Sequence, residues 1–409
     1  MVLQILILGL NYEPEPIGIG PYTAGLAQYL AARGHEVTVI AGNPYYPDWR
    51  LAEGANPAGS SETKNGVKII RVPHYIPSRP SGVKRILHYL SFARNARSAA
   101  KNSGPADIVV AIAPALLSAP VALRVAQQRR AVSWLHIQDF EVEAAIATGL
   151  LSRGPIASLA KRFERWVLSS FDHVSSVSPM MALKAKRKGA DANRTVELRN
   201  WADESVKPSL SRHETLRAEL SLPAGIIALY SGNLALKQGC GLLGEAAKVL
   251  AEEPGLHIVV CGAGPARKIL EEAACNLPNL HVRDLMPRER LNDLLGMADI
   301  HLLPQIEGAA DLVLPSKLAN MLASGRPVVA TAKAGTGLAQ EVEGCGIITP
   351  PGNAHHFAQA IKLLAKDAGM RATLGDAAAK RAHERWTSTV LLERFALALE
   401  HAVSMPEEV

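Results

Sequence analysis

The sequence predicts an α/β protein built from two successive Rossmann-like domains, and three observations support this fold class. Short runs rich in Val and Ile alternate with helical patterns, as expected for parallel sheets that are covered on both faces. The alternation stops over Trp201–Pro223 and restarts at Ile226. The chain has 409 residues, of which 48% are hydrophobic and 20% charged, so each half is long enough to bury its own core.

The first half opens with a strand, Leu3–Gly9, a glycine-containing loop and a helix, Pro21–Ala32. Gly34 follows the helix at a position where a glycine cap is common. A second helical pattern covers Val83–Lys101. The other strands expected in this half are Val37–Ile40, Val67–Val72, Ile108–Ile112, Ala131–Leu135 and His173–Val177.

The second half repeats the pattern and ends in a long helix, Ser388–Met405. Its expected strands are Ile226–Tyr230, Leu256–Cys261, His281–Arg283, Ile300–Leu303 and Pro327–Thr331. We place an N-terminal domain at residues 1–205, a C-terminal domain at 206–386 and the last helix within 387–409. Ligands of such sheets bind beyond the carboxyl ends of the strands, so two domains that face each other form a cleft suited to joining two substrates.

Neither a secretory signal nor a membrane-spanning segment is expected. The apolar start of the chain lacks a basic region before it. The uncharged run Ile108–Leu123 contains two prolines and is shorter than the roughly 20 apolar residues of a spanning helix. The four cysteines form no C-x-x-C pair, which favours reduced thiols in a cytosolic protein.

Positive charge is concentrated in the first half. Residues 1–205 carry 24 Lys/Arg and 16 Asp/Glu, and the rest carries 20 and 22, so the net charge of +6 arises from the first half. Thr63–Ala106 contains nine basic residues and no acidic one. Such a stretch favours an anionic partner, either nucleic acid or a membrane leaflet, although a solvated helix face explains it equally.

Two glycine stretches follow strands but do not fit a dinucleotide. Gly18-Ile19-Gly20 and Gly262-Ala263-Gly264 both lack the third glycine of G-x-G-x-x-G, and no acid follows the first by about 20 residues. Each stretch either lets the backbone approach a phosphate or is simply a tight turn.

Two further stretches predict an anion site. "YSGNLALKQG" places Lys237 between a strand and a helix, where it can reach a diphosphate over helix N-termini. "VLPSKLANMLASGRPVVA" is expected to place Pro315 in a first helical turn and Gly325 after the helix, so that Ser316, Lys317 and Asn320 lie at its start. A solvated lysine and a plain capped helix are the alternatives.

"WLHIQDFEVEAA" is expected to place His136 and Asp139 just past a strand end, where catalytic groups are common. Glu141 and Glu143 alternate with Asp139, but we do not expect a metal because the chain has no D-x-D pair. A single His is often structural, so a hydrogen-bonding role in the fold remains open for His136.

In combination and in order, these stretches resemble glycosyltransferase family 4, retaining enzymes of the GT-B fold, and most of all the branch of the colanic-acid biosynthesis fucosyltransferase. The resemblance extends over nearly the whole chain and includes "NYEPEPIGIGPYTAGLAQYL", "NPYYPDW", "HIQDFEVEAA", "RNWAD" and "CGAGP". It implies two domains facing across a cleft, with the C-terminal helix packing back toward the N-terminal domain.

The resemblance also implies a nucleotide-sugar donor, GDP- or UDP-linked, with no metal and no other cofactor. His136 would contact the transferred sugar, Asp139 would lie near the acceptor, and Lys237 and Lys317 would neutralise the diphosphate. Met286 would line the base pocket. The donor-binding residues implied are Gly18, Ile19, Gly20, Gly232, Asn233, Lys237, Gly262, Gly264, Met286, Leu314, Ser316, Lys317 and Asn320.

Three positions depart from the family pattern. Leu312 and Asn320 stand where most members have the two glutamates of E-x7-E, and Asn233 stands where an arginine is usual. Asn320 can still hydrogen-bond hydroxyl groups but carries no charge. The base and sugar of the donor therefore stay open, with GDP-fucose one candidate.

For the acceptor, the resemblance implies a polyprenyl-diphosphate-linked glycan and a peripheral location on the inner face of the cytoplasmic membrane. The basic helix would meet that surface, and the "NPYYPDW" aromatics would contact sugar or lipid, although plain packing explains them as well. The residues concerned are Tyr45, Tyr46, Trp49, Lys84, Arg85, Arg94 and Arg97.

Three other classes of protein remain as alternatives. A non-catalytic sugar-nucleotide binder fits the departures at Leu312 and Asn320. A sugar-nucleotide epimerase shares the two-domain architecture but needs a pair of catalytic carboxylates, which we do not find. A nucleic-acid-binding protein fits the basic first half, but aromatic residues make up only 5% of the chain and no nucleic-acid motif is present.

Overall fold

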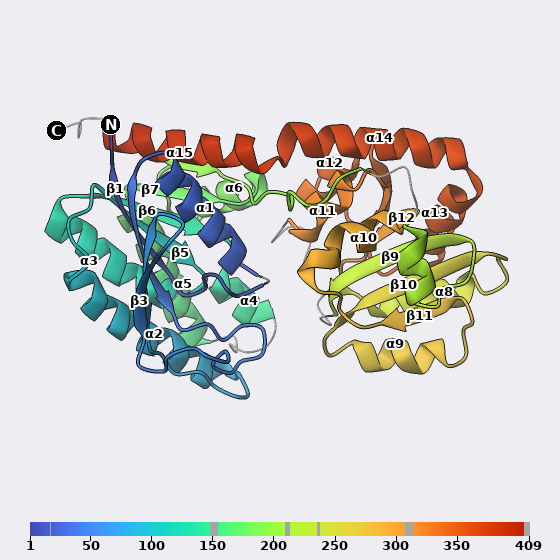
Figure 1. The fold of residues 1–409 in the computed structure, drawn as a ribbon, viewed down its shortest axis with the longest axis horizontal. Helices are drawn as coiled ribbons and strands as arrows, with labels where there is room; N and C mark the ends of the chain where they lie inside the picture. The colour runs from blue at the N-terminus through green and yellow to red at the C-terminus, as the bar shows by residue number, and fades with distance from the viewer. Residues whose placement is uncertain (17, 148–153, 209–212, 235–237, 307–313, 405–409) are drawn as a thin grey trace. The chain divides into compact units, whose positions relative to one another are not determined.

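The computed structural model describes residues 1–16, 18–147, 154–208, 213–234, 238–306 and 314–404. Contacts divide the chain into two compact units, Met1–Arg199 with Leu392–Val409, and Asn200–Leu391. The sequence placed these divisions at 205 and 386. Figure 1 shows both units as α/β structures, which confirms the predicted fold class.

The first unit contains an eight-stranded sheet in the order β3-β4-β2-β1-β5-β6-β7-β8. Neighbouring strands are parallel except β3 and β4, which are antiparallel. The strands are β1 Gln4–Gly9, β2 Glu36–Gly42, β3 Ser60–Lys64, β4 Val67–Val72, β5 Ile108–Ala113, β6 Val132–Ile137, β7 His173–Ser176 and β8 Thr195–Glu197. Strands β3 and β8 were not predicted, because β3 is fully exposed and has no apolar residue, and β8 has only three residues.

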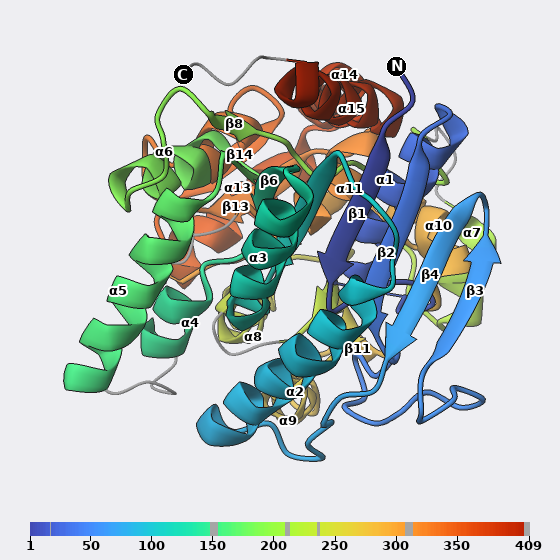
Figure 2. The same ribbon diagram turned by 90° about the vertical axis from the view of Figure 1, so that its left-hand side faces the viewer.

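Helices cover both faces of this sheet. On one face α2, α3 and α5 lie side by side (Figure 2), and their apolar residues pack with Leu135 in one core. On the other face, Phe395 of α15 packs against Trp134 and His136. The helices are α1 Gly20–Ala32, α2 Gly82–Lys101, η1 Leu116–Ser118, α3 Ala119–Arg129, α4 Glu141–Ala147, α5 Pro155–Ser170, α6 Pro179–Arg187 and α15 Ser388–Ser404.

The C-terminal helix α15 is fixed to the first unit by charged contacts. Arg33, which caps the carboxyl end of α1, pairs with Glu393 at 2.6 Å and with Glu400 at 2.7 Å. His35 lies 3.0 Å from the same Glu400. The return of the C-terminal helix to the N-terminal unit is thereby confirmed.

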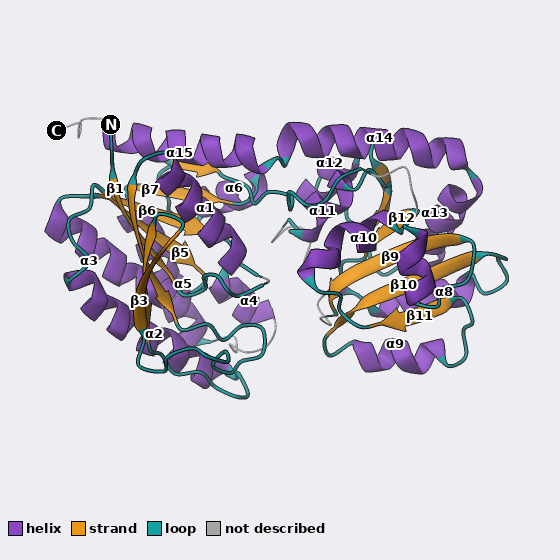
Figure 3. Cartoon of the chain, viewed as in Figure 1, coloured by secondary structure: helices purple, strands orange, loops and turns teal. Residues whose placement is uncertain are grey.

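The second unit contains a fully parallel six-stranded sheet in the order β11-β10-β9-β12-β13-β14 (Figure 3). Its strands are β9 Ile226–Asn233, β10 Leu256–Ala263, β11 Leu280–Arg283, β12 Ile300–Leu303, β13 Val328–Thr331 and β14 Gly346–Thr349, the last of which was not predicted. Its helices are α7 Glu214–Glu219, α8 Gly241–Val249, α9 Arg267–Ala274, η3 Arg288–Arg290, α10 Leu291–Gly296, α11 Lys317–Ala323, α12 Gly337–Val342, α13 Ala354–Lys366 and α14 Ala368–Arg385.

Each sheet has a point where the strand order reverses, between β1 and β5 in the first unit and between β9 and β12 in the second. Ligands of doubly wound sheets bind at the carboxyl ends of the strands at such points. The loop after β1, with Gly18 and Gly20, starts at the first of these points, and the segment after β9 starts at the second. Gly262 and Gly264 lie instead at the carboxyl end of β10, the strand beside β9.

Three local predictions were wrong. Strands β9 and β10 continue further than expected, so that Gly232 and Gly262 are paired strand residues instead of loop residues. Strand β6 continues to Ile137, so His136 lies within it and not past its end. Helix α11 begins at Lys317, so Pro315 precedes the helix. Gly34 and Gly325 do follow their helices with positive φ, as predicted.

Candidate functional site

The amino end of α11 brings Lys317 to the carboxyl end of β9. The Lys317 ammonium group donates to the Tyr230 hydroxyl at 2.8 Å and lies 3.4 Å from Gln238 Oε1. It also lies 4.0 Å from the centre of the Tyr230 ring. Within the described part of the chain, no carboxylate pairs with it. Among the described residues, the hydrogen-bond partners of Lys317 are therefore neutral.

Burial is the main influence on the pKa of the Lys317 ammonium group. Removal from water lowers the pKa of Lys317 to about 8. The Tyr230 hydroxyl keeps its proton because burial raises its pKa. It can give that proton to Gln238 Oε1 at 2.6 Å or to the Asn233 carbonyl at 2.7 Å. An anion that reached Lys317 would supply the missing opposite charge.

Glycine residues lie near the Lys317 ammonium group and leave the backbone there uncovered. Gly232 has φ +119, and a Cβ there would lie 3.6 Å from Lys317 Nζ. A Cβ on Gly262 would lie 2.1 Å from the Gly232 carbonyl oxygen, and one on Gly264 would lie 2.9 Å from Leu234. Gly262 and Gly264 thus allow β10 to approach the end of β9, and only Gly232 faces the lysine directly.

Tyr230 and Gln238 were missed by sequence reasoning, although both stand in the "YSGNLALKQG" stretch. In the sequence, Tyr230 was interpreted as the apolar last residue of a strand, and Gln238 as a linker residue. A buried tyrosine needs a hydrogen-bond partner for its hydroxyl group, and this requirement could have pointed to a polar partner for Tyr230. Lys237 and Leu312 lie outside the described residues.

The remaining predicted donor residues are dispersed around α11 and β11. Asn320 accepts a hydrogen bond from the Asp203 backbone at 2.7 Å, which ties α11 to the start of the second unit. Ser316 is exposed at the N-cap of α11, and Leu314 is buried in the core beneath that helix. Met286 is half-buried and packs against the neighbouring core cluster.

In the first unit, the predicted glycine residues shape the turn between β1 and α1. Gly18 has φ +78, and a Cβ there would lie 3.3 Å from the Tyr46 ring. Gly20 begins α1, and a Cβ there would lie 3.3 Å from the Tyr12 backbone. The Ile19 carbonyl accepts hydrogen bonds from Tyr22 and Thr23 and so starts the helix. Tight packing accounts for both glycines.

Glu15, a residue that sequence reasoning missed, anchors this turn. Its Oε1 accepts hydrogen bonds from the Tyr45 and Tyr46 backbone N–H groups, each at 3.1 Å. Its Oε2 accepts one from Asn11 at 2.9 Å. Burial raises the pKa of this carboxyl group. Glu15 thus joins the glycine turn to the "NPYYPDW" loop.

His136 is 3% exposed, on the sheet face covered by α15. Its Nδ1 lies 2.8 Å from the Ser175 hydroxyl. Burial lowers its pKa to about 3, so the ring is neutral at pH 7. These contacts account for His136 as a structural hydrogen-bonding residue, and contact with a sugar stays a prediction. Asp139 is half-buried in the turn after β6.

The acidic side chains after Asp139 are engaged within the fold. Glu141 accepts hydrogen bonds from the Ala115 and Leu116 backbones, at 2.9 and 2.5 Å. Glu143 pairs with Lys184 and, at 2.9 Å, with Lys188. Among the described residues, no group of three or more His, Cys, Asp or Glu side chains is arranged to hold a metal.

The predicted acceptor aromatics divide into buried and part-exposed residues. Tyr45 is 5% exposed and packs edge-on against Trp49, His74 and His88, which supports the packing alternative, and contact with sugar or lipid stays a prediction. Tyr46 and Trp49 are half-buried. Arg85 stacks over the Trp49 ring at 5.9 Å, whereas Lys84, Arg94 and Arg97 are exposed.

Comparison with known proteins decides the family. Residues 18–201 match the family described as "Glycosyl transferase 4-like domain", and residues 225–367 match "Glycosyl transferases group 1". The chain is also 39% identical to WcaI of Escherichia coli (strain K12), over 83% of this chain and 86% of that protein. WcaI is named as a glycosyl transferase of colanic acid biosynthesis.

The chain belongs to glycosyltransferase family 4. As a member, it is a hexosyltransferase with the GT-B fold. The sucrose-phosphate synthase of Thermosynechococcus elongatus matches this glycosyltransferase with a TM-score of 0.77 and 19% identity, over 97% of this chain and 98% of that one. WaaG, a glycosyltransferase of lipopolysaccharide biosynthesis, matches with a TM-score of 0.69 and 18% identity, over 96% and 98%. At these identities the two structures support the fold alone.

The glycosyltransferase presents exposed apolar side chains on two helices of its first unit. Each is between 47% and 71% exposed. They are Val83, Ile86, Leu87 and Leu90 on α2, and Ile156, Leu159 and Trp166 on α5. Both helices run back from the carboxyl edge of the sheet, so these residues, except Trp166, lie near that edge. The α5 residues were missed, although their spacing is helical and basic residues stand between them. In the described ranges, no helix combines the length and apolarity needed to cross a membrane.

Proposed function

We propose that this enzyme is a retaining glycosyltransferase that moves a sugar from a nucleotide-diphosphate donor to a lipid-linked glycan during surface-polysaccharide synthesis. The donor is GDP-fucose or another GDP- or UDP-sugar. One observation carries the proposal: Lys317, a cation without an acidic partner among the described residues, lies beside Gly232 at the switch point of the second sheet.

The donor diphosphate would replace the neutral partners of Lys317 with an opposite charge. When the sugar–phosphate bond breaks, negative charge develops on the leaving diphosphate. A fixed, part-buried cation stabilises such charge more than water does, because no solvent has to reorganise. Tyr230 and Gln238 would hold the ammonium group toward the phosphate, and Lys237 would supply a second cation. No metal enters this scheme.

Attack by the acceptor on the same face of the sugar would retain the configuration at the anomeric carbon. Such a reaction requires no pair of catalytic carboxylates flanking the bond, unlike glycosidases. Beside Asp139, the two glutamates that follow β6, Glu141 and Glu143, are already bonded within the fold. Their engagement supports a mechanism in which the leaving group, and not a protein carboxylate, assists the attack.

Relatives support the polysaccharide pathway and the class of donor. WcaI is named for colanic acid biosynthesis. HepE of Anabaena was solved in complex with UDP and matches this chain with a TM-score of 0.67 and 17% identity, over 98% of this chain and all of that one. The acceptor would be a polyprenyl-diphosphate-linked glycan at the inner face of the cytoplasmic membrane.

The exposed apolar residues of α2 and α5 would place the first unit on that membrane. Basic side chains on the same helices add attraction, at about 1 kcal/mol for each residue near an anionic leaflet. We expect Leu87→Ser combined with Leu159→Ser to reduce flotation with phosphatidylglycerol vesicles several-fold. Leu183→Ser, which changes an exposed leucine of α6, is the matched control. Equal flotation of both variants would contradict this placement.

The decisive experiment is a thermal-shift panel of GDP-, UDP-, ADP- and TDP-linked sugars, with and without EDTA. A donor at about 100 times its Kd stabilises the protein by roughly 2.7 kcal/mol. We expect one nucleotide class to stabilise it, unchanged by EDTA, and Lys237→Ala and Lys317→Ala to weaken that effect without unfolding the protein. Stabilisation by none of the four classes would reject the proposal.

A second candidate is a sugar-nucleotide binder without catalytic activity. It is favoured by Asn320, whose amide oxygen is already bonded to the Asp203 backbone at the position where family members carry a ribose-binding glutamate. This candidate predicts stabilisation by one nucleotide class but no release of the nucleoside diphosphate when extracted lipid-linked glycans are added. Release of the diphosphate excludes it.

A further inference from the structure

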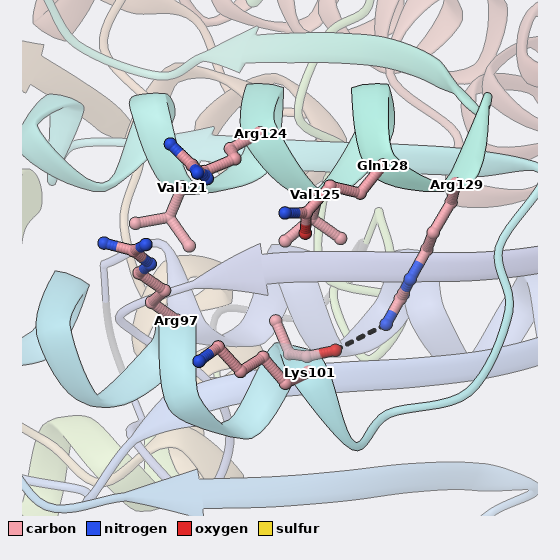
Figure 4. Close-up of a pocket in the computed structure, with 8 residues that line it drawn as sticks. Arg97, Lys101, Val121, Arg124, Val125, Gln128 and Arg129 are labelled. Carbon is pink, nitrogen blue, oxygen red and sulfur yellow. Dashed lines mark hydrogen bonds between the residues drawn. The ribbon is translucent and has the colours of Figure 1, made fainter.

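A groove between α2 and α3 lies apart from the donor site and shares Arg97 with the predicted membrane-facing residues. It has a volume of about 170 Å³, and Figure 4 shows its lining. Ligand pockets for drug-sized molecules span roughly 300–1,000 Å³, so this groove suits a small group and not a nucleotide sugar. Its lining residues are Arg97, Ala100, Lys101, Val121, Arg124, Val125, Gln128 and Arg129.

The groove has a cationic rim and an apolar floor. Arg97 and Lys101 extend from α2, Arg124 and Arg129 belong to α3, and the two valines lie between the helices (Figure 4). Neither α2 nor α3 contains an acidic residue. In the part of the chain that the structure describes, Arg97, Lys101 and Arg124 have no ion-pair partner. Four positive charges are thus held close together without neutralisation.

Arg129 differs from the solvated side chains around the groove, because its guanidinium group is held by hydrogen bonds and is partly buried. Its Nη2 donates to the Ala100 carbonyl and, at 3.1 Å, to the Ser103 hydroxyl, which fixes the guanidinium group across the end of α2. Its Nη1 is buried and has no hydrogen-bond partner among the described residues. A buried guanidinium N–H without a partner is costly, so an acceptor at this point would be favourable.

The position of the groove separates it from the donor and acceptor sites. Arg97, Lys101 and Arg129 lie in the last turns of α2 and α3, toward the amino edge of the parallel sheet. Ligands of such sheets bind at the opposite, carboxyl edge. Along α2 the exposed large apolar residues lie between Val83 and Leu90, beside the exposed Lys84, whereas from Arg94 onward the exposed cations are Arg94, Arg97 and Lys101.

We propose that this groove binds a phosphate-bearing anion. A phosphate group offers several acceptor oxygens that match guanidinium donors in pairs. The valine floor accommodates a carbon attached to the phosphate. Two sources share this chemistry, the headgroup of an anionic phospholipid and a soluble phosphate compound. The lipid form rests on the membrane part of the proposed function, whereas the soluble form does not.

The test compares two double variants of the first unit that lose equal charge. Arg97→Ala with Arg124→Ala removes groove cations, and Arg130→Gly with Arg187→Ala, which changes an exposed arginine of α6, removes cations outside it. Arg130 has φ +55, so glycine suits that position. Calorimetry with inorganic phosphate at constant ionic strength measures the soluble form, and flotation with phosphatidylcholine vesicles, with and without phosphatidylglycerol, measures the lipid form. Circular dichroism confirms that both variants fold.

We expect the groove variant to bind at least tenfold more weakly than the control variant, because each charged hydrogen bond contributes about one factor of ten. Loss in calorimetry identifies a soluble phosphate, and loss confined to phosphatidylglycerol vesicles identifies a headgroup. Equal behaviour of the two variants in both assays overturns the proposal. No donor or acceptor is present, so these results do not depend on whether the protein transfers sugar.

Discussion

In the first unit the chain after β1 carries a buried carboxyl group, that of Glu15, whereas in the second unit the chain after β9 lies against a part-buried ammonium group, that of Lys317. Both regions read as strand, glycine and helix, and both stand at a switch point. Glu15 is occupied by three N–H donors within its own unit. The partners of Lys317 in the described ranges, Tyr230 and Gln238, are neutral.

This difference shows that a glycine in a turn predicts that another group lies close to its backbone. It does not predict whether that group is a backbone segment of the protein or a charged side chain. Gly20 is explained by the backbone of Tyr12, and Gly262 by the carbonyl of Gly232. At Gly232, in contrast, the nearest side-chain atom is the ammonium group of Lys317, 3.6 Å from a Cβ placed there. We therefore assign anion binding to the second unit, and attachment of a neighbouring loop to the first.

The pH dependence of the protein's stability gives the strongest test of the contrast between Glu15 and Lys317, because it measures whether the Lys317 ammonium group is buried. The pKa of Lys317 is about 8 in the folded protein and 10.5 ordinarily. Below pH 8 the ammonium is charged in both states, and its burial costs up to about 3 kcal/mol. Between pH 8 and 10.5 the folded protein gives up the proton first, so stability rises. We expect Lys317→Met to be more stable than the wild type at pH 7, with the difference shrinking toward pH 10.5 in thermal melts. Parallel melting profiles would show that the ammonium is not buried.

The same substitution should have the opposite effect on ligand binding. Lys317→Met removes one charged hydrogen bond to the diphosphate, about 1.5–3 kcal/mol or a factor of roughly 10–100 in Kd. Titration with UDP and GDP, followed by calorimetry, measures the loss. Lys248→Met, which removes an exposed lysine of α8, serves as the control and should bind normally. Unchanged affinity in Lys317→Met would remove the anion site from the second unit.

In the first unit, Glu15→Ala should loosen a loop and leave diphosphate affinity unchanged. It leaves the N–H groups of Tyr45 and Tyr46 without their acceptor, at a cost of about 1–3 kcal/mol. Hydrogen exchange should therefore speed up over residues 43–50. Glu36→Ala, an exposed change in the same unit, should leave exchange there as it is. A loss of diphosphate affinity in Glu15→Ala would contradict our division of roles.

The smallest expected effect concerns the residue that holds the lysine. Tyr230→Phe removes the hydroxyl that accepts from Lys317, an interaction of about 0.5–1.5 kcal/mol. We expect the Kd for the diphosphate to rise by about 2–10-fold and the pKa of Lys317 to change. Measuring the Kd for the diphosphate at a series of pH values between 6 and 10 gives both the affinity and the pKa of Lys317. A variant with the wild-type pH profile would show that Tyr230 does not position the ammonium group.

Much of the fold and part of the site followed from the sequence. Alternating apolar and helical patterns sufficed for most strands and for the restart at Ile226, because buried parallel strands and their covering helices have distinct periods. Strand β3 was beyond that method, since Ser60–Lys64 is exposed and pairs through its backbone alone. Lys317 was predicted, but Tyr230 was not, because its partner is 87 residues away in the chain.

The sequence by itself determined most of the buried strands, where glycines allow tight turns, and that the first half is basic. These properties depend on neighbouring residues and on composition. The tertiary structure alone decided which charges are buried and with what partners. It placed Glu15 beneath the N–H groups of Tyr45 and Tyr46, isolated Lys317 among neutral groups, and brought Arg97 and Arg129 together across two helices. Burial and pairing depend on residues that only folding brings into contact.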